Sequence, residues 1–176
     1  MIDLQPWSDD DLWVVERFLS DPEMMEHLGG PQSREQILNA HQRFLNTGTS
    51  GAGRMFKVTL GPGSDVIGNI GFWDKTWRDH LVYETGWMIF PEFQGRGHAS
   101  EALATLVGRL QRDHSRRFLH AFPSITNGPS NALCRKFGFA NLGECEFEYP
   151  PGKLLRCNDW RLDLSLAQDP PNPPPN

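Results

Sequence analysis

A glycine-rich turn opens the most strongly patterned helix predicted in the chain. The residues Gln94-Gly95-Arg96-Gly97-His98-Ala99 follow an alternating segment, 81–90, and precede apolar residues at helical spacing from 99 to 110. The first backbone N–H groups of a helix have no intrahelical partner and lie at the positive end of its dipole. The two glycines let a ligand approach the backbone closely. The turn therefore predicts a phosphate or pyrophosphate site, with Arg96 and His98 as additional cationic contacts.

Two other phosphate-binding patterns fit the same turn less well. A dinucleotide-binding turn continues as G-x-G-x-x-G/A and places an acid about 20 residues later, at the end of the next strand. Here Ser100 holds the third position, and the nearest acid, Asp113, falls at the predicted helix end. The P-loop pattern G-x-x-x-x-G-K-[ST] does not occur in the sequence.

Glu84 is a candidate functional carboxylate, because it lies on the strand that leads into this turn. Partial burial would raise the pKa of its carboxyl toward neutrality. The alternative is a surface carboxylate in a salt bridge.

Trp73 and Trp77 lie in a polar stretch near Asp74 and Asp79, a combination that suits an ammonium group through charge and cation–π attraction. Phe72 and Trp87 are better explained as core residues.

Composition limits the classes of partner. The chain has 176 residues, a formal net charge of −5 and a pI of about 5.6, which disfavours nucleic acid as a partner. The three cysteines include no C-x-x-C pair, and the histidines form no H-E-x-x-H pattern, so neither a disulfide framework nor a metal site is expected. No targeting segment or membrane span is recognisable, and a cytoplasmic location is expected.

The periodicities predict one α/β domain over residues 1–167 and a disordered, proline-rich tail over 168–176. Helices are expected after two cap-like pairs, Ser8 with Asp11 and Ser33 with Gln36, and again from 99 and from 127 to 136. The expected strands are 2–5, 55–60, 66–73, 81–90, 117–122, 142–149 and 154–164.

The turn and its surroundings resemble the GNAT N-acetyltransferases. Residues 94–99 match that family's signature Q/R-x-x-G-x-G/A, and Asn127-Gly128-Pro129-Ser130 with Lys136-Phe137-Gly138-Phe139 is similar to its second cofactor segment. The opening, from Leu4-Gln5-Pro6-Trp7 to Leu28-Gly29, resembles the ribosomal-protein N-terminal acetyltransferases. The resemblance covers roughly residues 2–165 and implies a mixed, mostly antiparallel twisted sheet with a V-shaped splay, flanked by about four helices.

The resemblance also implies a cofactor and roles for individual residues. Acetyl-CoA would bind with its pyrophosphate on the amides from Gln94 to Ala99, next to Ser100. Its pantetheine arm would pair with the backbone of Met88, Ile89 and Phe90. Asn127 would bond it near the thioester, with Ser130 and Lys136 as weaker contacts. The N–H of Ile89 would stabilise the developing oxyanion if the strand is irregular there.

One position departs from the family pattern. Many members carry a tyrosine, the proton donor to the departing thiolate, seven residues after the equivalent of Asn127, where this chain has Cys134. A buried thiol is more often a core residue than an acid, and Ser130 and Tyr149 are other candidate donors, so the acid is unassigned.

The expected function is therefore transfer of an acetyl group to a primary amine, on a protein N-terminus or a small molecule, with Glu84 as base and Trp73 and Trp77 near the acceptor. The alternative is a catalytically weak acyl-CoA-binding module that acts as a sensor or scaffold. No metal, nucleic acid or membrane is expected, and the protein is expected to be a monomer or homodimer.

Overall fold

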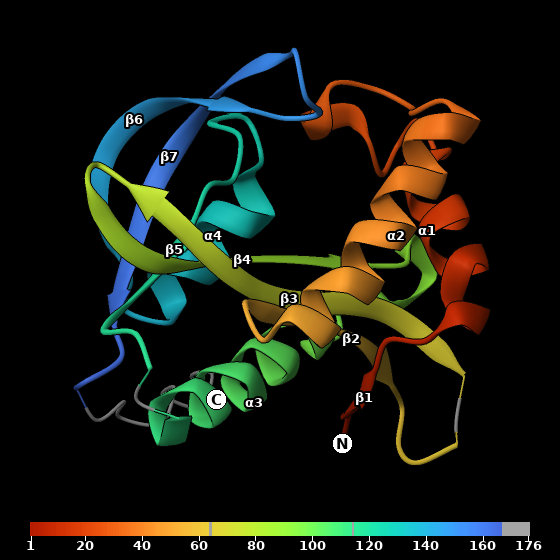
Figure 1. The fold of residues 1–176 in the computed structure, drawn as a ribbon, viewed down its shortest axis with the longest axis horizontal. Helices are drawn as coiled ribbons and strands as arrows, with labels where there is room; N and C mark the ends of the chain where they lie inside the picture. Colours follow the sequence, from red (N-terminus) through yellow and green to blue (C-terminus); the bar gives the residue numbers. More distant parts are fainter. Residues whose placement is uncertain (64, 114, 167–176) are drawn as a thin grey trace.

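A seven-stranded sheet forms the centre of the computed structural model, which describes residues 1–63, 65–113 and 115–166 (Figure 1). The strands lie in the order β1-β2-β3-β4-β5-β7-β6, and every neighbouring pair is antiparallel except β4–β5. Their bounds are β1 Asp3–Pro6, β2 Gly53–Thr59, β3 Val66–Trp77, β4 His80–Ile89, β5 Phe118–Ala121, β6 Ala140–Glu148 and β7 Leu154–Asp163. The expected α/β class with a mostly antiparallel sheet is confirmed. The expected tail, 168–176, lies outside the described residues.

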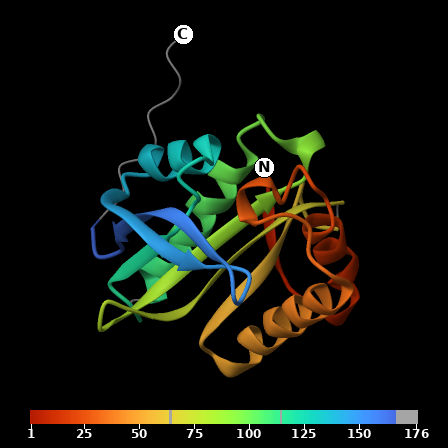
Figure 2. The same ribbon diagram turned by 90° about the horizontal axis from the view of Figure 1, so that it is seen from above.

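Four α-helices cover the two faces of this sheet (Figure 2). Helices α1 (Leu12–Leu19) and α2 (Arg34–Ser50) lie on one face, where their apolar residues pack around Phe90. Helices α3 (His98–Asp113) and α4 (Gly128–Lys136) contribute to the larger core on the other face. Successive side chains of a strand point to opposite faces, so Tyr83 and Ile89 of β4 lie in the larger core, whereas Phe90, which follows the strand, lies in the smaller one.

Both predicted capping boxes form at the N-termini of the first helical segments. Ser33 accepts the backbone N–H of Gln36, whose side chain accepts the N–H of Ser33 at 2.8 Å. The carboxylate of Asp11 accepts both the backbone N–H and the hydroxyl of Ser8, at 2.7 and 2.8 Å. The short 3₁₀ helix Asp9–Asp11 then leads directly into α1.

The hairpin of β3 and β4 is longer than the sequence predicts. Strand β3 was expected to end at Trp73, but it continues to Trp77, and β4 begins at His80. The two residues between them, Arg78 and Asp79, have φ angles of +48° and +65°, as a two-residue type I′ turn requires. Trp73 and Trp77 therefore lie on a strand, not in a polar connection.

Strands β4 and β5 separate soon after they meet. Their parallel pairing is limited to Tyr83 with Leu119 and Glu84 with His120, although β4 runs on to Ile89. Beyond Glu84 the backbone of β4 pairs with no further strand on this side within the described parts of the chain. This is the V-shaped splay that was expected, and Glu84 lies at its root.

Candidate active site

The turn before α3 presents backbone donors that have no acceptor among the described residues. Gly95 and Gly97 adopt left-handed φ angles of +72° and +85°, and a Cβ built on either would meet no atom within 4 Å. The first bond of the helix runs from Glu101 N–H to Gly97 C=O. In the part of the chain that the structure describes, the amides from Gly95 to Ser100 have no hydrogen-bond acceptor. This open run of donors fits a pyrophosphate.

Some side chains around the turn already have protein partners, and others do not. The side-chain amide of Gln94 donates to the Ile89 carbonyl at 2.8 Å, so it fastens the turn to the end of β4. Arg96 is exposed. The Nδ1 atom of His98 is buried without a hydrogen-bond partner among the described residues. The Oγ atom of Ser100 accepts a hydrogen bond from the ammonium of Lys136 at 3.2 Å. The residues of the turn therefore fit the coenzyme A pyrophosphate.

The backbone of Ile89 faces the splay. Phe90 N–H donates to the Ile67 carbonyl on the β3 side at 2.9 Å. Ile89 and its partner Gly68 thus form a non-hydrogen-bonded pair, in which the N–H of Ile89 points away from β3. The same alternation turns the backbone of Met88 toward β3. The pairing of β3 with β4 shows no register shift, so the exposure of the Ile89 N–H follows from ordinary strand geometry.

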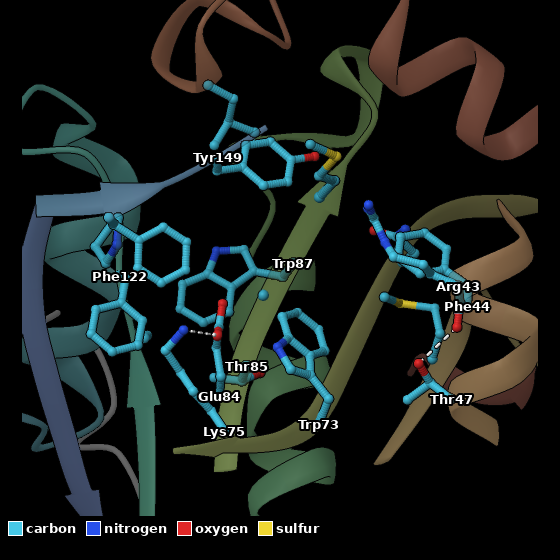
Figure 3. Close-up of a pocket in the computed structure, with 18 of the residues that line it drawn as sticks. Arg43, Phe44, Thr47, Trp73, Lys75, Glu84, Thr85, Trp87, Phe122 and Tyr149 are labelled. Carbon is cyan, nitrogen blue, oxygen red and sulfur yellow. Dashed lines mark hydrogen bonds and ion pairs between the residues drawn. The ribbon is translucent and has the colours of Figure 1, made fainter. Parts of the chain in front are cut away.

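A cavity of about 730 Å³ opens at the root of the splay (Figure 3). Its floor comes from β3 and β4, one wall from the first helices and the opposite wall from β5 and the β6–β7 hairpin. Seven aromatic side chains contribute to the lining, namely Phe18, Phe44, Trp73, Trp87, Phe122, Phe147 and Tyr149. Met88, Asn127 and Ser130 also line the cavity, so it joins the end of β4 to the start of α4. Its mostly apolar lining and few polar groups are typical of a small-molecule site.

Glu84 is the buried carboxylate of this cavity, with a side chain that is 11% exposed. Its Oε2 lies 3.2 Å from Nζ of Lys75, a neighbour on β3 that Figure 3 shows beside it. Burial raises the pKa of the Glu84 carboxyl, and the charge and hydrogen bond of Lys75 oppose that rise without cancelling it. A carboxylate whose pKa is raised toward neutrality is suited to accept a proton.

Trp73 and Trp77 are placed differently. Trp73 pairs with Glu84 across the hairpin and lines the cavity. Trp77 is not among the lining residues of the described chain; its indole N–H donates to Asp159 at 2.8 Å, and its ring packs edge-on against Phe122. Asp74, expected near an ammonium group, is held by Arg116 through two hydrogen bonds of 3.1 Å.

A buried acid and histidine lie behind Glu84. Asp159 is fully buried, and its Oδ1 is 2.7 Å from Nδ1 of His120, the strand partner of Glu84. Burial raises the pKa of Asp159, but the hydrogen bonds from His120 and Trp77 outweigh it, so the pKa is lowered overall. Glu84 is therefore flanked by polar groups on both neighbouring strands, Lys75 on β3 and His120 on β5.

The fold places one candidate proton donor in the core and the other two at the cavity. Cys134 is fully buried in the larger core, and burial raises the pKa of its thiol to about 12. Ser130 and Tyr149 line the cavity. The Tyr149 hydroxyl accepts a hydrogen bond from Gln32 at 3.2 Å, which leaves its own hydrogen free to donate, and burial raises its pKa. Asn127 caps α4 by accepting the N–H of Ser130 at 3.1 Å.

Lys75 and Phe147 are two cavity residues that the sequence does not reveal. Lys75 becomes significant only through the strand register that brings it next to Glu84. Phe147 lies 63 positions beyond Glu84 and reaches the cavity through the last hairpin. Among the described residues, no three His, Cys, Asp or Glu side chains are grouped to hold a metal ion, and no described helix is long and apolar enough to cross a membrane.

Comparisons with known proteins agree with this geometry. Residues 2–140 match the model of the acetyltransferase (GNAT) domain. The sequence is 27% identical over 150 residues to the uncharacterized N-acetyltransferase YnaD of Bacillus subtilis, covering 85% of this chain and 82% of that protein.

Two solved structures share the fold. One is the Salmonella typhimurium acetyl transferase that modifies the N-terminal serine of ribosomal protein L7/L12, with a TM-score of 0.73, 18% identity, and coverage of 92% of this chain and 94% of that one. The other is spermidine N-acetyltransferase from Vibrio cholerae in complex with CoA and spermine, with a TM-score of 0.75, 16% identity, and coverage of 93% and 96%.

Proposed function

Because this chain belongs to the GNAT family and is an N-acetyltransferase, we propose that it acetylates a primary amine that binds in the aromatic cavity against Glu84. When bound, acetyl-CoA supplies an activated acetyl thioester. The open amides from Gly95 to Ser100 would hold the pyrophosphate, and the Ile89 N–H would donate to the acetyl oxygen. Asn127 and Ser130 line the cavity where the thioester end would lie.

The observation that carries the proposal is the position of Glu84. It is buried at the root of the splay, and it lines a cavity that reaches the end of β4. An alkylammonium has a pKa of about 10 and must lose a proton before it can act as a nucleophile. Glu84, with its raised pKa, would take that proton directly or through water. The rings of Trp73 and Trp87 would hold the amine through apolar contact and cation–π attraction.

The class of acceptor follows from the lining. A mostly apolar cavity of about 730 Å³ accommodates a small amine or the first residues of a peptide. The two structural neighbours named above act on a protein N-terminal serine and on spermidine. We propose that the acceptor here also carries an unhindered primary amine.

A second candidate function is an acyl-CoA-binding sensor with little catalysis. The core position of Cys134 favours it, because this residue cannot return a proton to the leaving thiolate. Ser130 or Tyr149 would have to take that role in an active enzyme.

Thiol release from acetyl-CoA in the presence of a panel of primary amines distinguishes the two functions. The enzyme is expected to turn over at least one amine, and Glu84→Gln is expected to lower kcat/KM by about 100-fold or more, as loss of a general base does. Asp79→Asn, in the exposed β3–β4 turn, is the control. Tight acetyl-CoA binding without turnover of any amine would favour the sensor, and a genuine activity that Glu84→Gln leaves unchanged would remove Glu84 from the chemistry.

A further inference from the structure

A primary amine of the chain itself already lies in the proposed acceptor site. The ammonium of Lys75 is 3.2 Å from Glu84 Oε2, and both residues line the cavity (Figure 3). The Lys75 Nζ lies 4.6 Å from the ring centroid of Phe147, 5.5 Å from that of Phe122 and 5.6 Å from that of Trp77. An ammonium with a carboxylate on one side and aromatic rings around it is the arrangement expected for a bound amine substrate.

Lys75 is held there and not simply buried. Its side chain is 24% exposed, whereas that of Glu84 is 11% exposed. The amine therefore faces the space of the cavity while it remains paired with the proposed base. A nucleophile held next to its base reacts far faster than the same group free in solution.

We propose that Lys75 is an acetyl acceptor, so that the protein acetylates its own chain at this lysine when no other amine fills the cavity. The inference rests on the proposed function. Glu84 removes a proton from the Lys75 ammonium, and the neutral nitrogen forms a bond to the carbonyl carbon of the acetyl thioester. The carbon–sulfur bond breaks, the nitrogen gives up its second proton, and the leaving sulfur takes up a proton to give free coenzyme A. The product is a neutral acetyl-lysine.

The modification would change the site that produces it. Acetyl-lysine carries no charge, so Glu84 loses the neighbouring cation that lowers its pKa. The added acetyl group also occupies cavity space next to Glu84. Self-acetylation would therefore slow the acetylation of added amines as it accumulates.

The sequence provides internal controls, since it contains only four lysines: Lys57, Lys75, Lys136 and Lys153. Lys57 is the matched control, because its ammonium is also paired with a buried carboxylate, Asp11, at 3.0 Å, but it does not line the cavity. Lys153 is exposed and reports on chemical acetylation that needs no active site, and Lys136, which is also exposed, reports on acetylation beside the glycine turn.

The test is incubation of the full chain with acetyl-CoA, followed by intact mass measurement and peptide mapping over time. We expect one acetyl group per chain at Lys75, added at least about tenfold faster than at Lys57, Lys136 or Lys153. Lys75→Arg should abolish that mass increase, and Glu84→Gln should slow it by about tenfold or more. An added amine that the enzyme accepts should protect Lys75, and coenzyme A without an acetyl group should give no modification.

Three outcomes would overturn the inference. Acetylation of the exposed lysines at the same rate as Lys75 would identify plain chemical acetylation. An unmodified Lys75 in a protein that turns over added amines would reject the inference and leave the proposed function standing. A protein that neither modifies Lys75 nor turns over any amine would contradict both. Circular dichroism of Lys75→Arg and Glu84→Gln separates these results from misfolding.

Discussion

Glu84 is subject to two opposing effects at the scale of single residues. Burial raises the pKa of its carboxyl, and Lys75 lowers it. Removing the lysine charge must therefore raise the pKa further, because it leaves burial less opposed. In Lys75→Met the acidic limb of the pH profile of kcat/KM is expected to move to higher pH, since a base works only above its own pKa. Carbon-13 NMR titration of the Glu84 carboxyl should show the same direction without acetyl-CoA.

Lys75→Arg is the control for that shift, because it keeps a cation beside Glu84. The acidic limb of its pH profile should stay close to that of the parent sequence, measured with the same amine. Superimposable pH profiles for Lys75→Met and the parent sequence would show that the ion pair does not shift the pKa of Glu84.

The sequence predicts those residues of the site whose positions depend only on their spacing along the chain. Glu84 was predicted on the strand that leads into the glycine turn and lies there, whereas its place at the root of the splay comes from the pairing of β4 with β5. The neighbourhood of Lys75 could not be predicted, because it depends on the diagonal contact of two strands whose register the sequence leaves open. Trp73 and Trp77 looked equivalent in the sequence, but only Trp73 lines the cavity.

At the scale of elements, the turn before α3 depends on backbone shape. Gly97 has a left-handed φ of +85° and open space around it. In Gly97→Glu, a carboxylate would lie where the pyrophosphate is expected, and repulsion between like charges costs several kcal/mol. We expect the Kd for acetyl-CoA, measured by calorimetry, to rise by about 100-fold or more. Retained tight binding would contradict the assignment of this turn.

Gly30→Glu is the matched control for backbone strain. Gly30 has a φ of +88° and no atom within 4 Å of a built Cβ, but it follows the 3₁₀ helix Glu26–Leu28, outside the turn. Both variants place a glutamate at a left-handed position with open space. Equal loss of acetyl-CoA binding in the two would attribute the effect to general destabilisation.

The elements themselves followed from local patterns, apart from the end of β3. Helix α3 was predicted within one residue of its start, because its apolar spacing and its glycine turn agree. Strand β3 was predicted too short because its turn, Arg78-Asp79, lacks the glycine or asparagine that usually marks a two-residue hairpin. The cross-strand contacts of the long hairpin hold these two residues in an otherwise uncommon conformation.

At the scale of the whole molecule, the cleft exists because β4 and β5 share only two register pairs. The far wall of the cleft must then be held by contacts within the second half of the chain. Asn131 on α4 supplies many of them, since it is 8% exposed and its amide group makes four hydrogen bonds. It donates to the carbonyls of Ser124 and Asn127 at 2.9 and 2.7 Å and accepts from Asn158 and Trp160, each at 2.8 Å.

Asn131 therefore joins three parts of that wall: the loop after β5, the start of α4 and strand β7. In Asn131→Ala the indole N–H of Trp160, which is 4% exposed, would lose its acceptor within the core. An unsatisfied buried polar group costs about 1–3 kcal/mol, so the free energy of unfolding in urea should fall by about that amount. Asn141→Ala, which removes one exposed hydrogen bond to Gly143, should cost less than about 1 kcal/mol.

Hydrogen exchange should accelerate in residues 122–131 of the Asn131 variant, while the helices around Phe90 keep their protection, because their core lies on the other face of the sheet. Equal stability of the two variants, or exchange that rises uniformly through both cores, would show that Asn131 does not hold the far wall in place.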